Sequence, residues 1–133
     1  MMLLDTNACV HILKNSHAAL VARFCREDAR RLGLSSVVKS ELIYGAWHSQ
    51  RVEANLQALE RFWSPFQSLP FDDRCAEIAG RIRSDLRAKG TPIGGNDLLI
   101  AATALTHDAV LVTHNTREFS RVSGLRLDDW EVG

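Results

Sequence analysis

The sequence predicts a three-layer α/β/α domain in which a parallel sheet of four to five strands is covered by helices on both faces. Short apolar runs alternate with amphipathic segments of about ten to fifteen residues, the pattern of parallel strands joined by helices. The 133 residues are 46% hydrophobic and 24% charged, with no net charge, which suits a folded domain. No linker, repeat or low-complexity tract interrupts them, so we expect a single domain over residues 1–133.

The first elements are expected from short local patterns. Residues 2–4 are all apolar, so a strand formed by them is apolar on both of its faces. They predict a buried strand that ends at Asp5. A helix follows from Ala8 until residues 14–16 stop it. Residues 17–31 predict a second helix, because apolar side chains recur there at the spacing of one helical face and charged ones lie between them.

The middle of the chain predicts a strand and two helices. Residues 32–38 form the expected second strand. Ser40 is a favourable N-cap for a helix over residues 41–47. An amphipathic helix is expected over residues 52–63, and Pro65 ends it.

The second half predicts two more helices. One of the two aspartates at positions 72–73 caps a long helix through Ala88, and Gly90 closes it at a position where glycine favours a helix stop. After a glycine-containing loop, Asp97 opens a strongly helical run that ends at Thr106.

The remaining strands are expected at residues 66–71, 109–113 and 125–130. The stretch 109–113, AVLVT, is the clearest because its β-branched residues favour strands. Open parallel sheets bind ligands beyond the carboxyl ends of their strands, near the point where the strand order reverses. We therefore expect the chemistry of this protein at that edge.

Composition excludes several classes of protein. At zero net charge the chain is too apolar to be disordered, and no apolar run approaches the roughly 18 residues of a membrane helix. Three widely spaced cysteines fit neither a disulfide framework nor a zinc knuckle, so we expect a cytoplasmic protein whose reduced thiols pack as small hydrophobic groups. Without a basic excess, any attraction for nucleic acid must be local.

Three carboxylates have unusual neighbours. Asp5 directly follows the first strand, Glu41 follows the second, and Asp97 begins the helical run before the fourth. All three can converge on one edge of the sheet, where mutual repulsion favours a bound divalent cation such as Mg²⁺. Taken singly, each has a simpler interpretation as a helix cap or turn residue. Their grouping is what favours a metal site.

Three more polar residues follow the AVLVT strand at the same edge. Asn115 offers a neutral oxygen that could orient a water or a metal-bound group. Glu118 is either a fourth carboxylate or a solvated charge paired with Arg117 or Arg121. His114 is interpreted as an ordinary polar loop residue, because nothing pairs it with a serine or cysteine nucleophile.

Four short motifs stand in order along the chain: LDTN at 4–7, SELIYG at 40–45, NDLLIAA at 96–102, and LVTHN at 111–115 followed by REF at 117–119. Together with the closing segment 122–130, this order resembles the PIN-domain family, and more closely the VapC toxins of bacterial toxin–antitoxin pairs. The resemblance covers essentially the whole chain.

The resemblance implies an endoribonuclease, a hydrolase that cuts RNA phosphodiester bonds with Mg²⁺ or Mn²⁺. It makes Asp5, Glu41 and Asp97 the metal-binding carboxylates and Thr6 the residue that shapes the turn around Asp5. Many PIN domains have an aspartate where Asn115 stands. The site therefore either takes its fourth acid from Glu118 or has three acids.

The resemblance also implies partners. Such type II toxins commonly form homodimers and are inhibited by a VapB-like antitoxin, which lays a helix or an extended tail across the active-site groove. A close subgroup cuts initiator transfer RNA in its anticodon stem-loop, which makes this RNA a candidate substrate. Arg87 and Lys89 are the basic residues that we expect to hold the RNA backbone.

Two other functions stay open at this point. Asp5 at a strand end could accept a phosphoryl group, as in aspartyl-phosphate phosphotransferases, although the familiar second aspartate is replaced by Asn7. Because Asn115 stands in place of an acid, the chain could also be a catalytically weak module that recruits a partner. A dinucleotide-binding domain is unsupported, since no glycine-rich motif follows the first strand.

Overall fold

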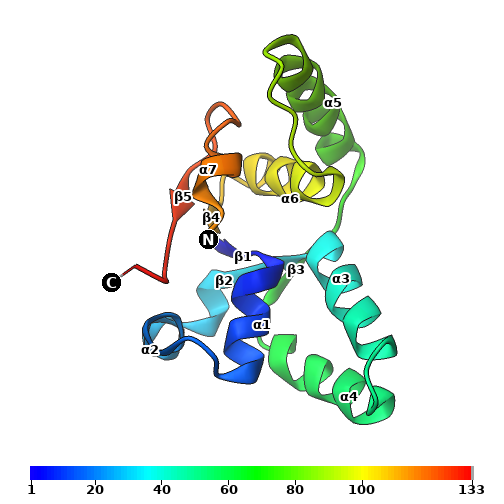
Figure 1. Ribbon diagram of the computed structural model, residues 1–133, viewed down its shortest axis with the longest axis vertical. Helices are drawn as coiled ribbons and strands as arrows, with labels where there is room; N and C mark the ends of the chain where they lie inside the picture. The colour runs from blue at the N-terminus through cyan, green and yellow to red at the C-terminus, as the bar shows by residue number, and fades with distance from the viewer. Residues whose placement is uncertain (133) are drawn as a thin grey trace.

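Five parallel strands form the centre of the fold, in the order β3-β2-β1-β4-β5 (Figure 1). The computed structural model describes residues 1–132. Its strands span Met2–Leu4 (β1), Leu32–Ser35 (β2), Gln67–Leu69 (β3), Val110–Val112 (β4) and Leu127–Asp128 (β5). The predicted parallel sheet of four to five strands is confirmed.

The strand order reverses at β1. The chain moves from β1 to β2 and β3 on one side and then returns to β4 on the other. Leu3 pairs with Gly33 of β2, while Leu4 pairs with Val112 of β4. Parallel pairing puts the carboxyl ends of β1 and β4 next to each other, and a ligand site is expected beyond them.

Helices cover both faces of the sheet. The α-helices within residues 1–132 are α1 (Thr6–Lys14), α2 (Ala18–Arg26), α3 (Ser36–Trp47), α4 (Val52–Trp63), α5 (Asp73–Ala88), α6 (Gly95–Thr106) and α7 (Thr116–Phe119), and a 3₁₀ helix covers Ala29–Arg31. Figure 1 shows α1 to α4 on one face and α5 to α7 on the other. The return crossover from β3 to β4 runs in the opposite direction and therefore occupies the opposite face.

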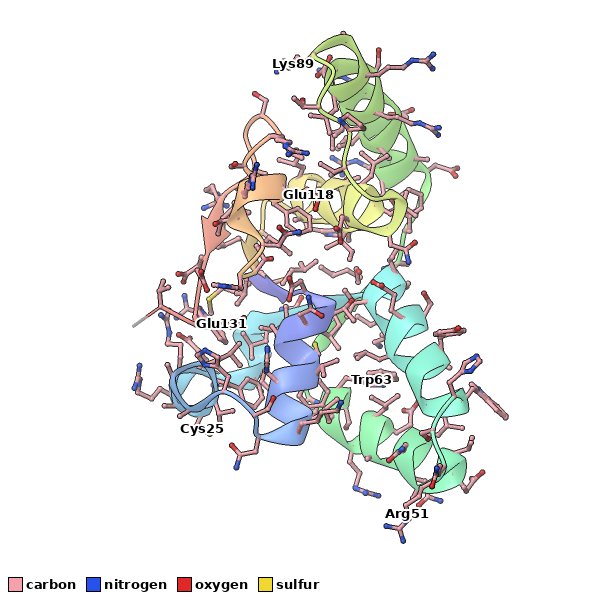
Figure 2. The ribbon with its side chains drawn as sticks, viewed as in Figure 1. Cys25, Arg51, Trp63, Lys89, Glu118 and Glu131 are labelled. Atoms are coloured by element: carbon pink, nitrogen blue, oxygen red, sulfur yellow. The ribbon has the colours of Figure 1, made fainter. Side chains whose placement is uncertain are left out.

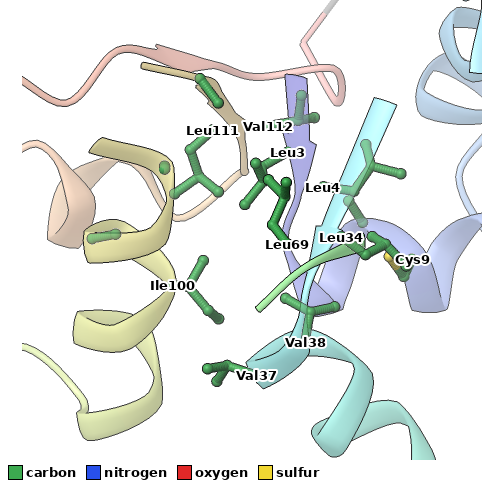
Figure 3. Packing of buried hydrophobic residues seen from close by; sticks show 14 of the residues in the cluster. Leu3, Leu4, Cys9, Leu34, Val37, Val38, Leu69, Ile100, Leu111 and Val112 are labelled. Atoms are coloured by element: carbon green, nitrogen blue, oxygen red, sulfur yellow. The ribbon is translucent and has the colours of Figure 1, made fainter. Parts of the chain in front are cut away.

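The hydrophobic core lies on both faces of the sheet. Trp63 of α4 is buried near α3 (Figure 2). Leu3 and Leu4 are both fully buried, although neighbours in a strand point to opposite faces. Figure 3 shows the apolar side chains of the strands between α6, which carries Ile100, and α1, which carries Cys9. The three-layer arrangement is thus confirmed.

Two boundaries near the N-terminus differ from the prediction. α1 begins at Thr6, two residues earlier than expected, with Asp5 as its N-cap. The helix expected over residues 17–31 is wrong in its second part, because α2 ends at Arg26 and Glu27 has extended backbone. This extended residue lets the chain turn towards β2.

The helix that carries Glu41 starts five residues earlier than expected. The hydroxyl of Ser35 accepts a hydrogen bond from the Val38 N–H at 3.1 Å and caps α3. Ser40 is not the cap, since its hydroxyl donates to the Val37 carbonyl at 2.8 Å within the helix. Glu41 therefore lies in the second turn, where no backbone group needs its carboxylate.

The second half agrees better with the prediction. α4 matches residues 52–63, the side chain of Asp72 caps α5, and Gly90 follows α5 with a φ of +69°. α6 starts at Gly95, so Asp97 does not open it. The short helix α7 was not predicted, and strands β2 to β5 are shorter than expected.

The three thiols are free. Cys9 and Cys75 are buried, as expected of small hydrophobic groups, whereas Cys25 is exposed, contrary to expectation. Between residues 1 and 132, none of the helices combines the length and apolar character needed to cross a membrane.

Candidate active site

A small hollow opens at the carboxyl edge of the sheet, near the segments that follow β1 and β4. Its volume is about 120 Å³, enough for several water molecules at roughly 30 Å³ each. It is lined by Asp5, Thr6, Asn7, Glu41, Asp97, Asn115 and Phe119. The fold thus brings together three carboxylates that lie far apart in the sequence, with two asparagines beside them.

Asp5 follows β1 directly and is 6% exposed. Its Oδ1 accepts a hydrogen bond from the Ala8 N–H at 2.8 Å, which caps α1. Burial raises the pKa of Asp5 above its usual value, and hydrogen bonds with Thr113 and Ala8 oppose only part of this rise. The charges of Glu131 and Glu41 raise the pKa further.

Glu41 is held from the opposite wall. The Thr6 hydroxyl donates a hydrogen bond to Glu41 Oε1 at 2.7 Å, which ties the first turn of α1 to α3 across 35 residues of sequence. Thr6 therefore fixes one oxygen of a neighbouring carboxylate in addition to beginning the helix after Asp5.

Asp97 lies in the first turn of α6. Its pKa is raised from the usual 3.8 to about 6, first by burial and then by the charges of Glu118, Glu41 and Asp5. The carboxylates that line or border the hollow thus make Asp97 harder to ionise.

Glu118 lies beside the hollow and uses both of its oxygens. Oε1 accepts a hydrogen bond from the Gly94 N–H at 2.9 Å, and Oε2 accepts one from Asn115 Nδ2 at 3.0 Å. These hydrogen bonds lower the pKa of Glu118. Glu118 therefore holds the Asn115 amide and links it to the loop that leads to Asp97.

The acidic groups have no cationic partners close by. Within the described part of the chain, none of Asp5, Glu41 and Asp97 forms an ion pair with a basic side chain. In residues 1–132, no three His, Cys, Asp or Glu side chains form a ready-made ion site either. Within residues 1–132, no ion pair therefore neutralises the negative charge that the hollow concentrates.

Neither of the two basic residues expected to hold RNA lines this hollow. Arg87 lines a separate groove between α5 and α6. Lys89 follows the last residue of α5, and Figure 2 shows it at the far tip of the molecule. The sequence pattern could not show that Arg87 lines a groove whereas Lys89 lies at the tip of the molecule.

Two lining residues were not predicted to belong to the metal site. Asn7 belongs to the LDTN motif and Phe119 ends the REF motif, so their only signal was membership in those motifs. His114 lies outside the hollow, with its Nδ1 2.9 Å from Asp129 Oδ2.

Comparisons with known proteins point to one family. The family model of the PIN domain matches residues 2–125. The tRNA(fMet)-specific endonuclease VapC of Shigella flexneri is 43% identical over 128 residues, which cover 96% of each chain. Ribonuclease VapC2 of Rickettsia felis is 37% identical over 131 residues, or 97% of each chain.

Solved structures agree with these relatives. The DNA-bound VapBC of Salmonella typhimurium matches with a TM-score of 0.89 and 41% identity over 97% of both chains. FitAcB of Neisseria gonorrhoeae matches with a TM-score of 0.90 and 27% identity over 100% of both chains. Because sequence and fold agree over almost the whole length, the chain belongs to the PIN-domain family and, within it, to the VapC ribonucleases.

Proposed function

We propose that this chain is a metal-dependent endoribonuclease that acts as the toxin of a type II toxin–antitoxin pair. The observation that carries the proposal is the group of carboxylates in one hollow, which together raise the pKa of Asp97 and, within residues 1–132, form no ion pair with a basic side chain. Relatives named ribonucleases and solved VapBC complexes support the same reaction and the same kind of partner.

The donor set fits a hard divalent cation. Asp5, Asp97 and Glu41 offer carboxylate oxygens and Asn115 a neutral one, which are the ligand types that Mg²⁺ and Mn²⁺ prefer. Mg²⁺ keeps several waters and needs only one or two direct carboxylates, so a tighter cage is not required. When bound, such an ion lowers the pKa of a water and offsets charge on the phosphate.

Within this proposal each residue has a distinct role. Asp5 and Asp97 are direct ligands, and Glu41 is a ligand or orients the attacking water. Thr6 fixes Glu41 Oε1, which leaves Oε2 free for that water. Asn115 Nδ2 is bound by Glu118, so the amide oxygen is the atom that remains to accept a hydrogen bond from a water.

The substrate that we propose is RNA with unpaired bases at the cleavage point. Relatives named for tRNA(fMet) make the anticodon loop of initiator transfer RNA the first candidate. The small volume of the hollow favours this choice, because an unpaired loop can splay its bases and bring one phosphate into a narrow site more readily than a rigid duplex can.

We propose that a VapB-like antitoxin docks on an apolar groove next to the site. This groove of about 390 Å³ lies between α1, α3 and α4, and Val10, Leu13, Leu42 and Leu59 line it. Leu13 is 38% exposed, which leaves apolar surface for a partner to cover.

The family resemblance adds a homodimer to the proposal. We also propose that the protein works in the cytoplasm, because its free thiols fit a reducing compartment.

Cleavage of initiator transfer RNA by the purified protein tests this function. We expect cutting with Mg²⁺ or Mn²⁺, none in EDTA, and a loss of at least about a hundredfold in kcat for Asp5→Asn. Asparagine also caps helices, so this variant should keep its fold. The matched control is Asp85→Asn, because Asp85 is exposed on α5 and lies outside the hollow.

The other candidate functions give different results. Full activity in excess chelator would contradict metal dependence. A phosphate trapped on Asp5 would favour a phosphotransferase. A folded protein that binds its antitoxin but cuts no RNA would favour a binding module.

A further inference from the structure

A larger hollow lies beside the acidic one, between α5 and α6, and we call it the α5–α6 groove. Its volume is about 670 Å³. Arg83 and Arg87 of α5 line one side of an otherwise largely apolar floor, and Gly95 and Asn96 in the first turn of α6 line it as well; the apolar residues are Leu86, Pro92, Ile93, Leu98 and Leu99. Because the next residue, Asp97, lines the acidic hollow, the two hollows share one helical turn.

The α5–α6 groove carries free positive charge. Arg83 and Arg87 are four residues apart on α5 and therefore lie on the same side of that helix. Both are exposed, and neither forms an ion pair within residues 1–132. Two guanidinium groups without a carboxylate partner suit phosphate oxygens, which match the planar fork of arginine.

The loop between α5 and α6 is held in place from the α7 side. Arg121 Nη1 donates a hydrogen bond to the Pro92 carbonyl at 3.0 Å, and the Gly94 N–H donates to Glu118 at 2.9 Å. Pro92 also lines the α5–α6 groove. The wall between groove and acidic hollow is thus fixed, and Arg121 adds a positive charge near it.

We propose that the α5–α6 groove binds the RNA backbone next to the phosphate that is cut, with Arg83 and Arg87 each contacting a flanking phosphate. The inference rests on the proposed ribonuclease function and adds the path of the substrate. In this arrangement the negatively charged carboxylates lie at the phosphate that reacts, and the positively charged guanidinium groups lie beside it. Lys89 has no part in this groove.

Two double variants, each of which removes two positive charges from α5, test the proposal. Arg83→Gln/Arg87→Gln changes the groove, whereas Arg74→Gln/Arg81→Gln changes two exposed arginines seven residues apart that share another side of the helix. We expect the groove pair to raise KM for RNA about tenfold and to leave kcat within about twofold. The control pair should change neither by more than about twofold.

Salt dependence gives a second readout. RNA binding is measured in EDTA, where no cutting is expected, at several salt concentrations. The logarithm of the binding constant falls with the logarithm of the salt concentration, with a slope of about 0.7 for each phosphate contact. For the groove pair, which loses two contacts, this slope should be smaller by about 1.4. Circular dichroism and Tm should match wild type for both pairs, since all four arginines are exposed.

The outcomes separate this inference from the proposed function. Equal effects of the two pairs, or an unchanged KM and salt slope for the groove pair, would overturn the groove assignment. A change in sedimentation mass with an unchanged slope would assign the groove to a second copy of the chain instead. If wild type cuts no RNA, the proposed function itself fails.

Discussion

Replacing Asp97 by asparagine should stabilise the metal-free protein and abolish its ribonuclease activity. The pKa of Asp97 is raised from 3.8 to about 6 because burial and the charges of Glu118, Glu41 and Asp5 oppose its ionised form. At neutral pH the folded protein must nevertheless hold a carboxylate there. Asparagine has nearly the same shape and no charge. The substitution therefore removes the free-energy cost of the buried charge, and it also removes a metal ligand.

The size of the gain follows from the pKa difference. A rise of about two pH units corresponds to about 3 kcal/mol at about 1.4 kcal/mol per unit. Asp97 is only partly buried, so solvent screening reduces this figure, and we expect a gain of about 1–2 kcal/mol. For a chain of this length, that gain raises the Tm by about 5 °C.

The gain should also depend on pH in a defined direction. The folded pKa lies above the unfolded one, so the folded state binds the proton more tightly and wild type loses stability as pH rises from about 4 to about 6. The asparagine variant lacks this titration. The difference in Tm should therefore be small near pH 4 and complete above about pH 6.5.

Thermal unfolding in EDTA, followed by circular dichroism at the two pH values, measures this difference. Glu77→Gln removes an exposed carboxylate of α5 and should change the Tm by about 1 °C or less. Addition of Mg²⁺ should raise the Tm of wild type more than that of Asp97→Asn. An equal gain at both pH values, or no gain at neutral pH, would refute the reasoning.

Three further variants probe other contacts. Thr6→Val removes the hydroxyl that donates to Glu41 and should lower kcat in an RNA-cleavage assay about tenfold with little change in Tm, whereas an unchanged kcat would limit Thr6 to a structural role. Leu13→Glu puts a charge in the groove between α1, α3 and α4, and should weaken antitoxin binding in calorimetry at least about tenfold while cleavage persists. Trp130→Ala removes a ring that is 3% exposed and lies under the Arg23 guanidinium, so urea titration should show a loss of about 3–5 kcal/mol; a loss below about 1 kcal/mol would contradict this role.

The sheet and most helices could be predicted because their signals are local. Alternation of apolar runs with amphipathic segments requires no knowledge of distant residues, and α4 matched its prediction at both ends. The start of α3 could not be predicted in this way. Ser35 and Ser40 are both good caps, and the choice depends on the end of β2, which is set by the pairing of Ser35 with Leu69 of β3.

The meeting of acidic residues at one edge was also predictable, since the carboxyl ends of parallel strands share that edge. The role of Glu118 was not, because its two hydrogen bonds join the Asn115 side chain to the backbone of Gly94, 24 residues away. The same holds for Arg83, whose position beside the first turn of α6 depends on how α5 packs against α6. Such contacts have no counterpart in local pattern or composition.

The contacts of the three central carboxylates separate a structural role from a functional one. Asp5 caps α1, so the fold itself has a use for it. Glu41 caps no helix, because Ser35 caps the helix that carries it, and the N-cap position of the helix that carries Asp97 is Gly94, without a side-chain cap. Both acids instead add repulsion to the hollow. Because the fold gains nothing from that repulsion, the physical reason for placing these two acids beside Asp5 is the cation that we propose they bind.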